Sequence, residues 1–181
     1  MKRATRKSKI DASFRLGRVV ENRWLRIFPD ARKSSKEEDM HMHVDFWHGD
    51  VGVDVKGNNL PDEIWVEFIN VNGKKGWLHG KSKYIAFDVP ELRGFIRVKR
   101  EELLEWCKHN VDKTYVPKND CYRKLYRRYG RQDCITKLTI NDLAELTSYT
   151  LIDYVSWIYH PVTGEKVQID QPRTRYKSTN V

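Results

Sequence analysis

The first part of the chain carries apolar residues at helical spacing. The predicted core face of this helix consists of Leu16, Val20, Trp24 and Ile27. Asp11 and Ser13 are both suitable N-caps and Pro29 ends the pattern, so a helix is predicted between them. The polar stretch 30–39 that follows is predicted to be a loop.

Strand patterns come next, in which apolar and polar residues alternate. The predicted strands span residues 40–47, 51–56, 63–70, 84–88 and 95–98. The short segment His48-Gly49-Asp50 is turn-like, which predicts that the first two strands form a β-hairpin. Asn72-Gly73 predicts a tight turn after the third strand.

Helix and strand signals return in the second half of the chain. Residues 99–110 are predicted to form a helix and residues 135–138 a short strand. A last helix, ending at Leu146, would be capped by Thr139 or Asn141. This order of elements indicates an α/β or α+β domain with a central mixed β-sheet. Of the two we expect the α/β class, with helices that flank the sheet.

Length and composition fit one domain with terminal extensions. The chain has 181 residues, of which 39% are hydrophobic, enough for a single core. We predict a flexible basic arm over residues 1–10, the domain over residues 11–160, and a polar basic tail over residues 161–181. No apolar run approaches the roughly 20 residues of a membrane span, and no signal-peptide pattern is present. We therefore expect a cytoplasmic protein, in a bacterium or a phage-infected cell, without a membrane partner.

The chain is strongly basic, with a formal net charge of +9. Such a charge favours a polyanionic partner, most simply nucleic acid, although proteins are also basic for other reasons. Cys107, Cys121 and Cys134 are odd in number and lack CxxC spacing, which argues against a disulfide framework and a zinc knuckle. Free thiols are the expected state of these cysteines.

The predicted hairpin brings three charged side chains together. Asp54 and Lys56 are two residues apart on one strand, so their side chains leave the same face of the sheet. Pairing across the turn places Asp45 beside Asp54, at the distance of cross-strand neighbours. Two carboxylates and one ammonium group are therefore expected on one patch.

These three groups suit metal-assisted phosphodiester hydrolysis. Adjacent carboxylates repel each other unless positive charge lies between them, and Mg²⁺ prefers oxygen ligands, retains waters and accepts a phosphate oxygen. A neighbouring ammonium group orients a water or stabilises negative charge on phosphorus. We expect Mg²⁺ as cofactor, with Mn²⁺ as a substitute. The alternative is an ordinary solvated strand face at Asp54 and Lys56, with Asp45 capping a turn.

The sequence His-Val-Asp at 43–45, followed by Asp-Val-Lys at 54–56, resembles the signature of the PD-(D/E)xK nucleases. That superfamily includes restriction enzymes, archaeal-type Holliday junction resolvases and phage nucleases. Its members usually carry a further acidic residue on the first helix, and Glu21 matches that position. The resemblance covers residues 13–107 and implies a restriction-endonuclease-like core.

The resemblance also implies roles for individual residues. Asp45, Asp54 and Glu21 would be the metal ligands, and Lys56 would position or activate the attacking water. The chain departs from the pattern where Val44 replaces a proline and where Asp54 stands in place of the commoner glutamate.

Two further residues lie beside the expected site. Glu67 is an additional metal ligand or a partner of Lys56, or else it forms a surface salt bridge. His43 is expected to share a strand face with Asp45, where it would bind phosphate or tune the site. A lone histidine on a strand is more often structural.

Two basic segments are candidates for contact with nucleic acid. The stretch 70–83 is rich in Gly and Lys, and its predicted contacts are Lys74, Lys75, Lys81 and Lys83. The stretch 118–131 interleaves tyrosines with basic residues, and its predicted contacts are Arg123, Arg127 and Arg128. The alternatives are a turn kept soluble by lysines, and an amphipathic helix whose tyrosines face the core.

The expected function is therefore a Mg²⁺-dependent endonuclease that cuts DNA, with the structure selectivity of junction resolvases. A homodimer follows from that analogy alone, because a junction has two strands to cut symmetrically. The alternatives are a non-catalytic nucleic-acid-binding protein on the same fold, a ribonuclease, and an inactive nuclease fold with a structural or inhibitory role. A phage or mobile element would suit such a compact nuclease.

Overall fold

The structure is a computed structural model that describes residues 6–57, 60–154, 157–159, 166–168 and 174–176. The helices are α1 (Arg6–Ile27), α2 (Lys36–Met42), α3 (Arg100–Asn110) and α4 (Ile140–Ala144), with 3₁₀ turns η1 (Trp77–His79), η2 (Pro90–Leu92) and η3 (Lys118–Asp120). The strands are β1 (Arg32–Lys33), β2 (Phe46–His48), β3 (Val51–Lys56), β4 (Ile64–Ile69), β5 (Tyr84–Val89), β6 (Gly94–Lys99), β7 (Asp112–Tyr115), β8 (Lys124–Leu125), β9 (Cys134–Leu138), β10 (Thr150–Asp153), β11 (Trp157–Tyr159), β12 (Lys166–Gln168) and β13 (Thr174–Tyr176).

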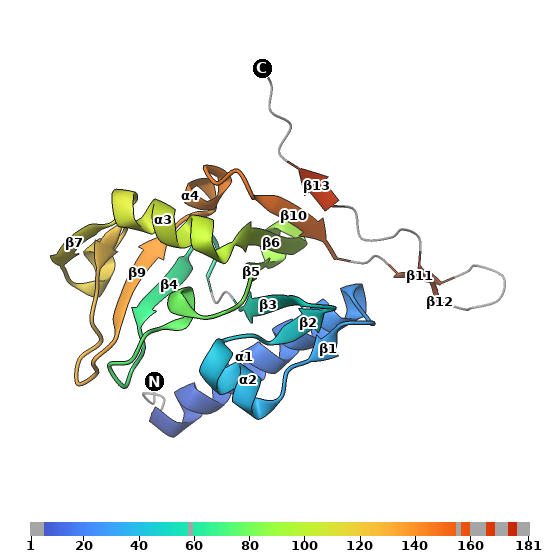
Figure 1. The fold of residues 1–181 in the computed structure, drawn as a ribbon, viewed down its shortest axis with the longest axis horizontal. Coiled ribbons are helices and arrows are strands. Elements are labelled where there is room, and N and C mark those ends of the chain that lie inside the picture. Colours follow the sequence, from blue (N-terminus) through green and yellow to red (C-terminus); the bar gives the residue numbers. More distant parts are fainter. Residues whose placement is uncertain (1–5, 58–59, 155–156, 160–165, 169–173, 177–181) are drawn as a thin grey trace, which may run out of the picture.

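The main sheet of the described chain has the strand order β1-β2-β3-β5-β6-β10-β13. Strands β3 and β5 run parallel, whereas the other neighbours are antiparallel, so the sheet is mixed. Helices α1 and α3 lie on either side of its central strands (Figure 1). The predicted α/β class with a flanked mixed sheet is confirmed. Strand β4 pairs with β9 beside this sheet.

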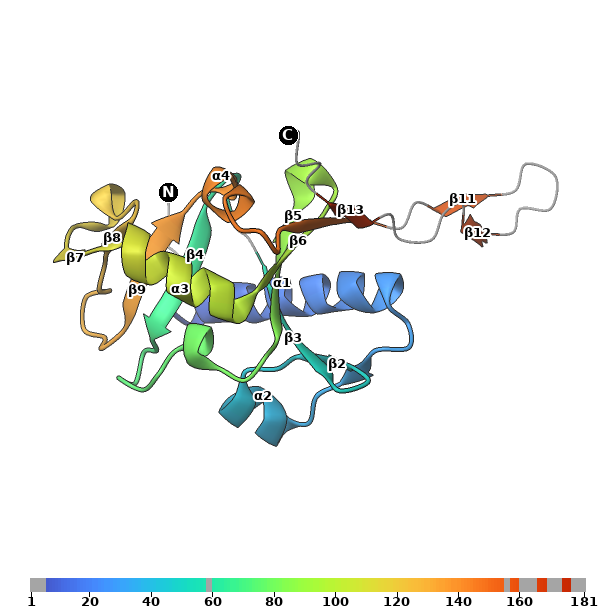
Figure 2. The ribbon, with the colours of Figure 1, turned by 45° about the horizontal axis from the view of Figure 1, so that its top comes forward.

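Side-chain alternation along β5 divides the core into two layers. Ile85 and Phe87 join the cluster that contains Leu103 of α3. Ala86, between them, joins the cluster that contains Val20 and Trp24 of α1. Because successive strand residues face opposite sides, each helix covers its own face of the sheet (Figure 2). All six of these side chains are nearly inaccessible to solvent.

Helix α1 is longer than predicted at its start. It begins at Arg6, so the prediction of a flexible arm was wrong for residues 6–10, while residues 1–5 lie outside the described part of the chain. The physical reason is that Lys and Arg are good helix formers and extend an amphipathic helix readily. The predicted end before Pro29 is confirmed, since the helix stops at Ile27.

The segment before the hairpin differs most from expectation. The predicted loop 30–39 and the first part of the predicted strand 40–47 are wrong, because α2 spans Lys36–Met42. Ser35 and Glu38 form a reciprocal capping box that nucleates this helix. The helix ends at His43, whose φ of 52° is left-handed. Helix capping therefore prevails over the short alternating pattern, and β2 begins only at Phe46.

The other predicted elements are confirmed within one or two residues. They are β3, β4, β5, β6, α3 and β9, together with the hairpin of β2 and β3. Gly49 and Gly73 take positive φ in the two predicted turns. Thr139, rather than Asn141, caps α4.

The end of the chain is not simply a tail. Residues 161–181 were predicted as a polar tail, yet Lys166–Gln168 and Thr174–Tyr176 are strands, and the latter pairs with β10 of the main sheet. Alternating residues such as those of β13 pair readily with an open sheet edge. The rest of the predicted tail lies outside the described residues. No helix in the described ranges is both long and apolar enough to cross a membrane.

Candidate active site

The hairpin positions Asp45 opposite Asp54. The register pairs Phe46 with Val53, and the Asp45 N–H donates to the Val53 carbonyl oxygen at 2.9 Å, so the pairing continues one residue beyond β2. The Val55 N–H donates to Asp45 Oδ2 at 2.7 Å, which fixes the carboxylate against β3. The predicted cross-strand placement of Asp45 and Asp54 is therefore confirmed.

Asp54 is a buried carboxylate with one partnered and one unpartnered oxygen. Its side chain is 1% exposed, and Oδ1 lies 2.5 Å from Lys56 Nζ. Oδ2 is buried, and no donor from the described residues reaches it. Such an oxygen is costly because it has lost water and gained no hydrogen bond. The alternative of an ordinary solvated strand face is therefore wrong for Asp54.

Asp45 makes the environment of Asp54 still less favourable for negative charge. Burial raises the pKa of Asp54 well above its ordinary value; Lys56 opposes this rise, and Asp45 adds to it. The two carboxyl groups are close enough to share a hydrogen bond when one of them carries a proton. Positive charge near the two carboxyl groups therefore stabilises their ionised forms, and Lys56 supplies part of it.

Lys56 lies between the carboxylate pair and the Trp77 ring. Burial opposes its charge, but Asp54 and Asp45 outweigh burial and raise the pKa of Lys56. Its ammonium group lies 5.3 Å from the centre of the Trp77 ring. The Lys56 side chain as a whole remains 29% exposed, and its ammonium group is paired with Asp54.

Glu67 lies on the far side of Lys56. Its carboxylate accepts a hydrogen bond from the Trp77 N–H, while burial raises its pKa and Lys56 opposes the rise. The predicted proximity of Glu67 to Lys56 is confirmed. The two side chains do not form an ion pair, so Glu67 affects the pKa of Lys56 only through the longer-range attraction between their charges.

Helix α2 adds two groups to the site that share one face, Asp39 and His43. Burial raises the pKa of Asp39, and the charge of Asp45 raises it further. Burial also lowers the pKa of His43, as does the charge of Lys56. His43 lies at the end of a helix rather than on a strand, so its predicted setting was wrong although its proximity to the site was right. Asp39 was missed because its segment was interpreted as a loop.

Glu21 is at the outer edge of this group. Its Oε2 lies 2.5 Å from Lys33 Nζ, and its side chain is 26% exposed. Its negative charge contributes to the raised pKa of Asp39. Glu21 therefore forms an ion pair with Lys33 and acts on the cluster through the electrostatic effect of its charge on Asp39. No described hydrogen bond joins Glu21 to Asp45 or Asp54.

The carboxylates around Asp54 form a small set of possible metal ligands. Within the described residues, no three side chains of His, Cys, Asp or Glu converge closely enough to hold an ion by themselves. Magnesium commonly uses only one or two carboxylates and takes its other ligands from water and phosphate. The unpartnered oxygen of Asp54 beside Asp45 fits this type of site.

No protein-family model, curated protein or solved structure matches this chain. Function is therefore inferred from the residues and geometry of the site. The site contains the carboxylate pair Asp45 and Asp54, the charged Lys56, and Glu21 at its edge.

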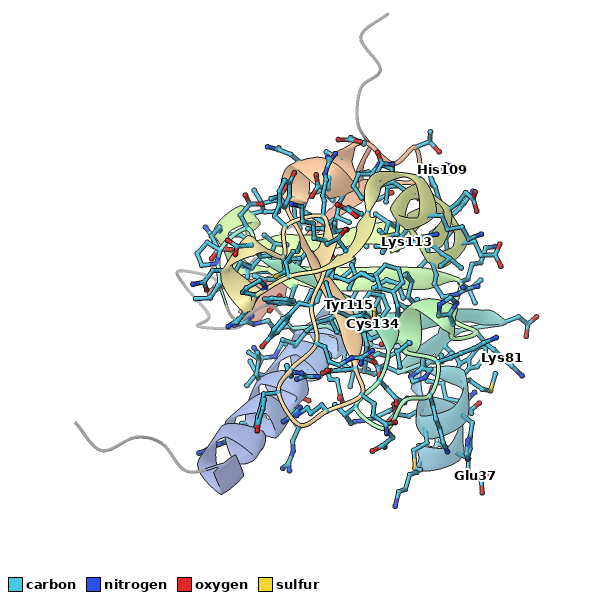
Figure 3. The ribbon with its side chains drawn as sticks, turned by 90° about the vertical axis from the view of Figure 1, so that its left-hand side faces the viewer. Glu37, Lys81, His109, Lys113, Tyr115 and Cys134 are labelled. Atoms are coloured by element: carbon cyan, nitrogen blue, oxygen red, sulfur yellow. The ribbon has the colours of Figure 1, made fainter. Side chains whose placement is uncertain are left out.

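The lysine-rich segment 70–83 borders the cluster. Lys74, Lys75, Lys81 and Lys83 are all exposed. The Lys81 N–H donates to Met42 O at 2.7 Å, and the Lys83 N–H donates to Gly52 O at 2.8 Å, so the segment lies against α2 and β3. Figure 3 shows Lys81 at the periphery of the molecule, beside the helix that carries Glu37.

Two of the arginines in segment 118–131, Arg123 and Arg128, form ion pairs with carboxylates of the protein. Arg123 pairs with the buried Asp142 at 2.5 Å and with Glu145 at 2.9 Å. Arg128 pairs with the buried Asp133. The segment is mostly irregular, so the amphipathic-helix alternative is wrong. Isolated buried carboxylates require such counter-charges, which explains why the arginines turn inward.

Arg127 is the arginine of that segment that remains exposed. Its guanidinium lies 4.9 Å from the centre of the Tyr115 ring and donates to the Tyr115 hydroxyl at 3.2 Å. Tyr115 and Cys134 lie next to each other (Figure 3). Of the three predicted arginine contacts, Arg127 is therefore the one that keeps its charge free of an ion pair with a described carboxylate.

A glycine secures the lysine-rich segment against α2. A Cβ at Gly80 would lie 2.7 Å from His43 Cβ and 2.9 Å from Met42 O. We expect Gly80→Ala to lower the free energy of unfolding by about 1–3 kcal/mol, because backbone on one side must move. Gly17 lies in α1 with open space around it, so Gly17→Ala is expected to raise stability by about 0.5–1 kcal/mol. Urea unfolding of both variants checks the prediction, which fails if Gly80→Ala matches the wild type.

Proposed function

We propose that this protein is a Mg²⁺-dependent endonuclease that hydrolyses phosphodiester bonds in DNA, on a restriction-endonuclease-like core. The observation that carries the proposal is the buried Asp54. One of its oxygens is bound by Lys56, the other lacks a donor among the described residues, and Asp45 lies close to the same carboxyl group. Burying a carboxylate oxygen without a partner is unfavourable in free energy, and a bound cation would remove this penalty.

In this proposal each residue of the cluster has a distinct task. Asp45 and Asp54 hold the ion, which when bound would polarise a phosphate oxygen and acidify a water. Lys56 donates from its exposed side to a water or to a phosphoryl oxygen and stabilises developing negative charge. Glu21 and Asp39 add negative potential at the outer edge, where water enters.

Binding of the substrate is assigned to the lysine-rich segment 70–83. Two of its exposed lysines, Lys81 and Lys83, are held against α2 and β3 by backbone hydrogen bonds, beside the elements that carry the cluster. Phosphate contacts of this kind position a duplex without reading its sequence. Arg127 would add a contact at a distance from the cluster. We therefore expect the nuclease to cut DNA with low sequence specificity.

The proposal is tested with plasmid, linear duplex, four-way-junction DNA and single-stranded RNA, each incubated with Mg²⁺ or with EDTA. We expect cleavage of DNA with Mg²⁺ and none with EDTA. Lys56→Met is expected to lower the rate by about 10²–10³-fold, as does the loss of a group that stabilises transition-state charge. Lys113→Met removes an exposed lysine of β7 and serves as the control for charge.

A second candidate is a non-catalytic nucleic-acid-binding protein with the same basic surface. The lack of a three-residue metal site in the described chain is the observation that favours it. Binding of DNA without cleavage in any divalent cation, and equal binding by wild type and Lys56→Met, would establish this candidate in place of the nuclease. Cleavage of RNA alone would retain the chemistry and change the substrate.

A further inference from the structure

A cavity lies on the opposite face of the sheet from the carboxylate cluster. It has a volume of about 320 Å³ and lies between the end of α1 and strands β3, β5 and β6. Trp24, Phe28 and Tyr84 provide aromatic walls. A volume of this size accommodates one or two fused rings with a small substituent. The apolar walls favour a ligand with a flat hydrophobic body.

Arg97 places a positive charge in this cavity. Its guanidinium carbon lies 4.6 Å from the centre of the Tyr84 ring, which holds the side chain in a stacked position. The Nε atom is buried, and no described residue accepts a hydrogen bond from it. A buried donor without an acceptor is unfavourable in free energy. A ligand that supplies an acceptor would complete the missing hydrogen bond of Arg97.

His48 supplies a second donor. Its Nε2 accepts a hydrogen bond from Trp24 Nε1 at 3.2 Å, so the proton of the neutral ring is assigned to Nδ1. Burial and the nearby Arg97 both lower the pKa of His48, in keeping with the neutral form. The cavity therefore combines aromatic walls with donors, and none of the described residues in its lining is a carboxylate.

The charge of Arg97 decides which ligand fits. An aromatic cage alone would suit an organic cation, but a guanidinium in its lining repels one. A carboxylate instead forms charge-assisted hydrogen bonds with guanidinium groups. We propose that this cavity binds a small planar aromatic carboxylate, whose ring lies among Trp24, Phe28 and Tyr84 and whose carboxylate accepts from Arg97.

The cavity is independent of the proposed nuclease site. Val51 and Val53 of β3 line it, whereas Asp54 and Lys56 alternate with them and face the other side. Ligand binding in the cavity can therefore be measured whether or not the protein cuts DNA. If either ligand binding or DNA cleavage fails, the other can still be tested.

The test uses the full chain and 2-naphthoate as the probe. Nuclear magnetic resonance follows the Trp24 indole N–H, which is bonded to a residue of the cavity wall. We expect a saturable shift of this signal with 2-naphthoate. The uncharged analogue 2-naphthalenemethanol is expected to bind the wild type at least about tenfold more weakly, as is usual when a charge-assisted hydrogen bond is lost.

Arg97→Met is expected to weaken 2-naphthoate binding at least about tenfold and to abolish its preference over the uncharged analogue. Lys113→Met, which removes a distant exposed charge, is expected to bind as the wild type does. The wild-type comparison of the two probes stands even if Arg97→Met unfolds. No saturable shift, or equal affinity for the charged and uncharged probes, overturns the proposal.

Discussion

Replacing Asp54 with asparagine is expected to lower Mg²⁺-dependent DNA cleavage by about 10²–10³-fold while the protein remains folded. The substitution keeps the shape of the side chain and removes the charge that would hold the cation beside Asp45. Asp50→Asn, an exposed change in the same hairpin, is the matched control and is expected to cut normally. Gel assays under single-turnover conditions measure both rates.

The same variant is expected to be more stable than the wild type in EDTA. Since burial raises the folded-state pKa of Asp54 above its ordinary value of 3.8, the folded protein binds more protons than the unfolded one above that pH. Wild-type stability therefore falls as the pH rises from about 4 through the raised pKa. Asp54→Asn lacks this loss, so its advantage grows toward neutral pH. Full cleavage activity in Asp54→Asn, or lower stability at neutral pH, would contradict the assigned role.

Removing Arg123 is expected to lower the free energy of unfolding by about 3 kcal/mol. Asp142 is 1% exposed and would lose its counter-charge, although the Tyr122 hydroxyl and the Thr139 N–H still donate to it. DNA affinity is expected to change little, because the guanidinium is already committed to Asp142 and Glu145.

The control for this variant is Lys124→Ala, which removes an exposed charge from the next residue. It is expected to leave stability within about 0.5 kcal/mol of the wild type. Urea unfolding and a DNA-binding titration measure the two properties. A loss of DNA affinity in a fully stable Arg123→Ala would instead make Arg123 a binding residue.

Local patterns predicted the hairpin well. Alternation of apolar residues over 51–56 and the Gly49 turn define the strand and its partner, so the pairing of Asp45 with Asp54 followed from the register. The burial of Asp54 did not follow, because burial depends on segments that are distant in sequence, such as η1, whose Trp77 ring lies 5.3 Å from the neighbouring Lys56 ammonium group. Alternation identifies which face a residue lies on but not what covers that face.

Helix α2 shows the opposite situation. The capping box of Ser35 and Glu38 is visible in the sequence and would have placed Asp39 on a helix near the site. Arg123 and Arg128 could not be assigned from sequence, because their partners Asp142 and Asp133 are recognised only once their burial is known. Positive charge along a chain does not distinguish a surface contact from an internal counter-ion.

The central claim is that a divalent cation binds between Asp45 and Asp54, and paramagnetic relaxation by Mn²⁺ tests it most directly. We predict that substoichiometric Mn²⁺ broadens the amide signals of residues 45 and 54–56 first, that excess Mg²⁺ reverses the effect, and that Asp54→Asn abolishes it. Broadening that spreads over surface acids such as Glu101 and Glu105, and is unchanged in Asp54→Asn, would contradict the claim.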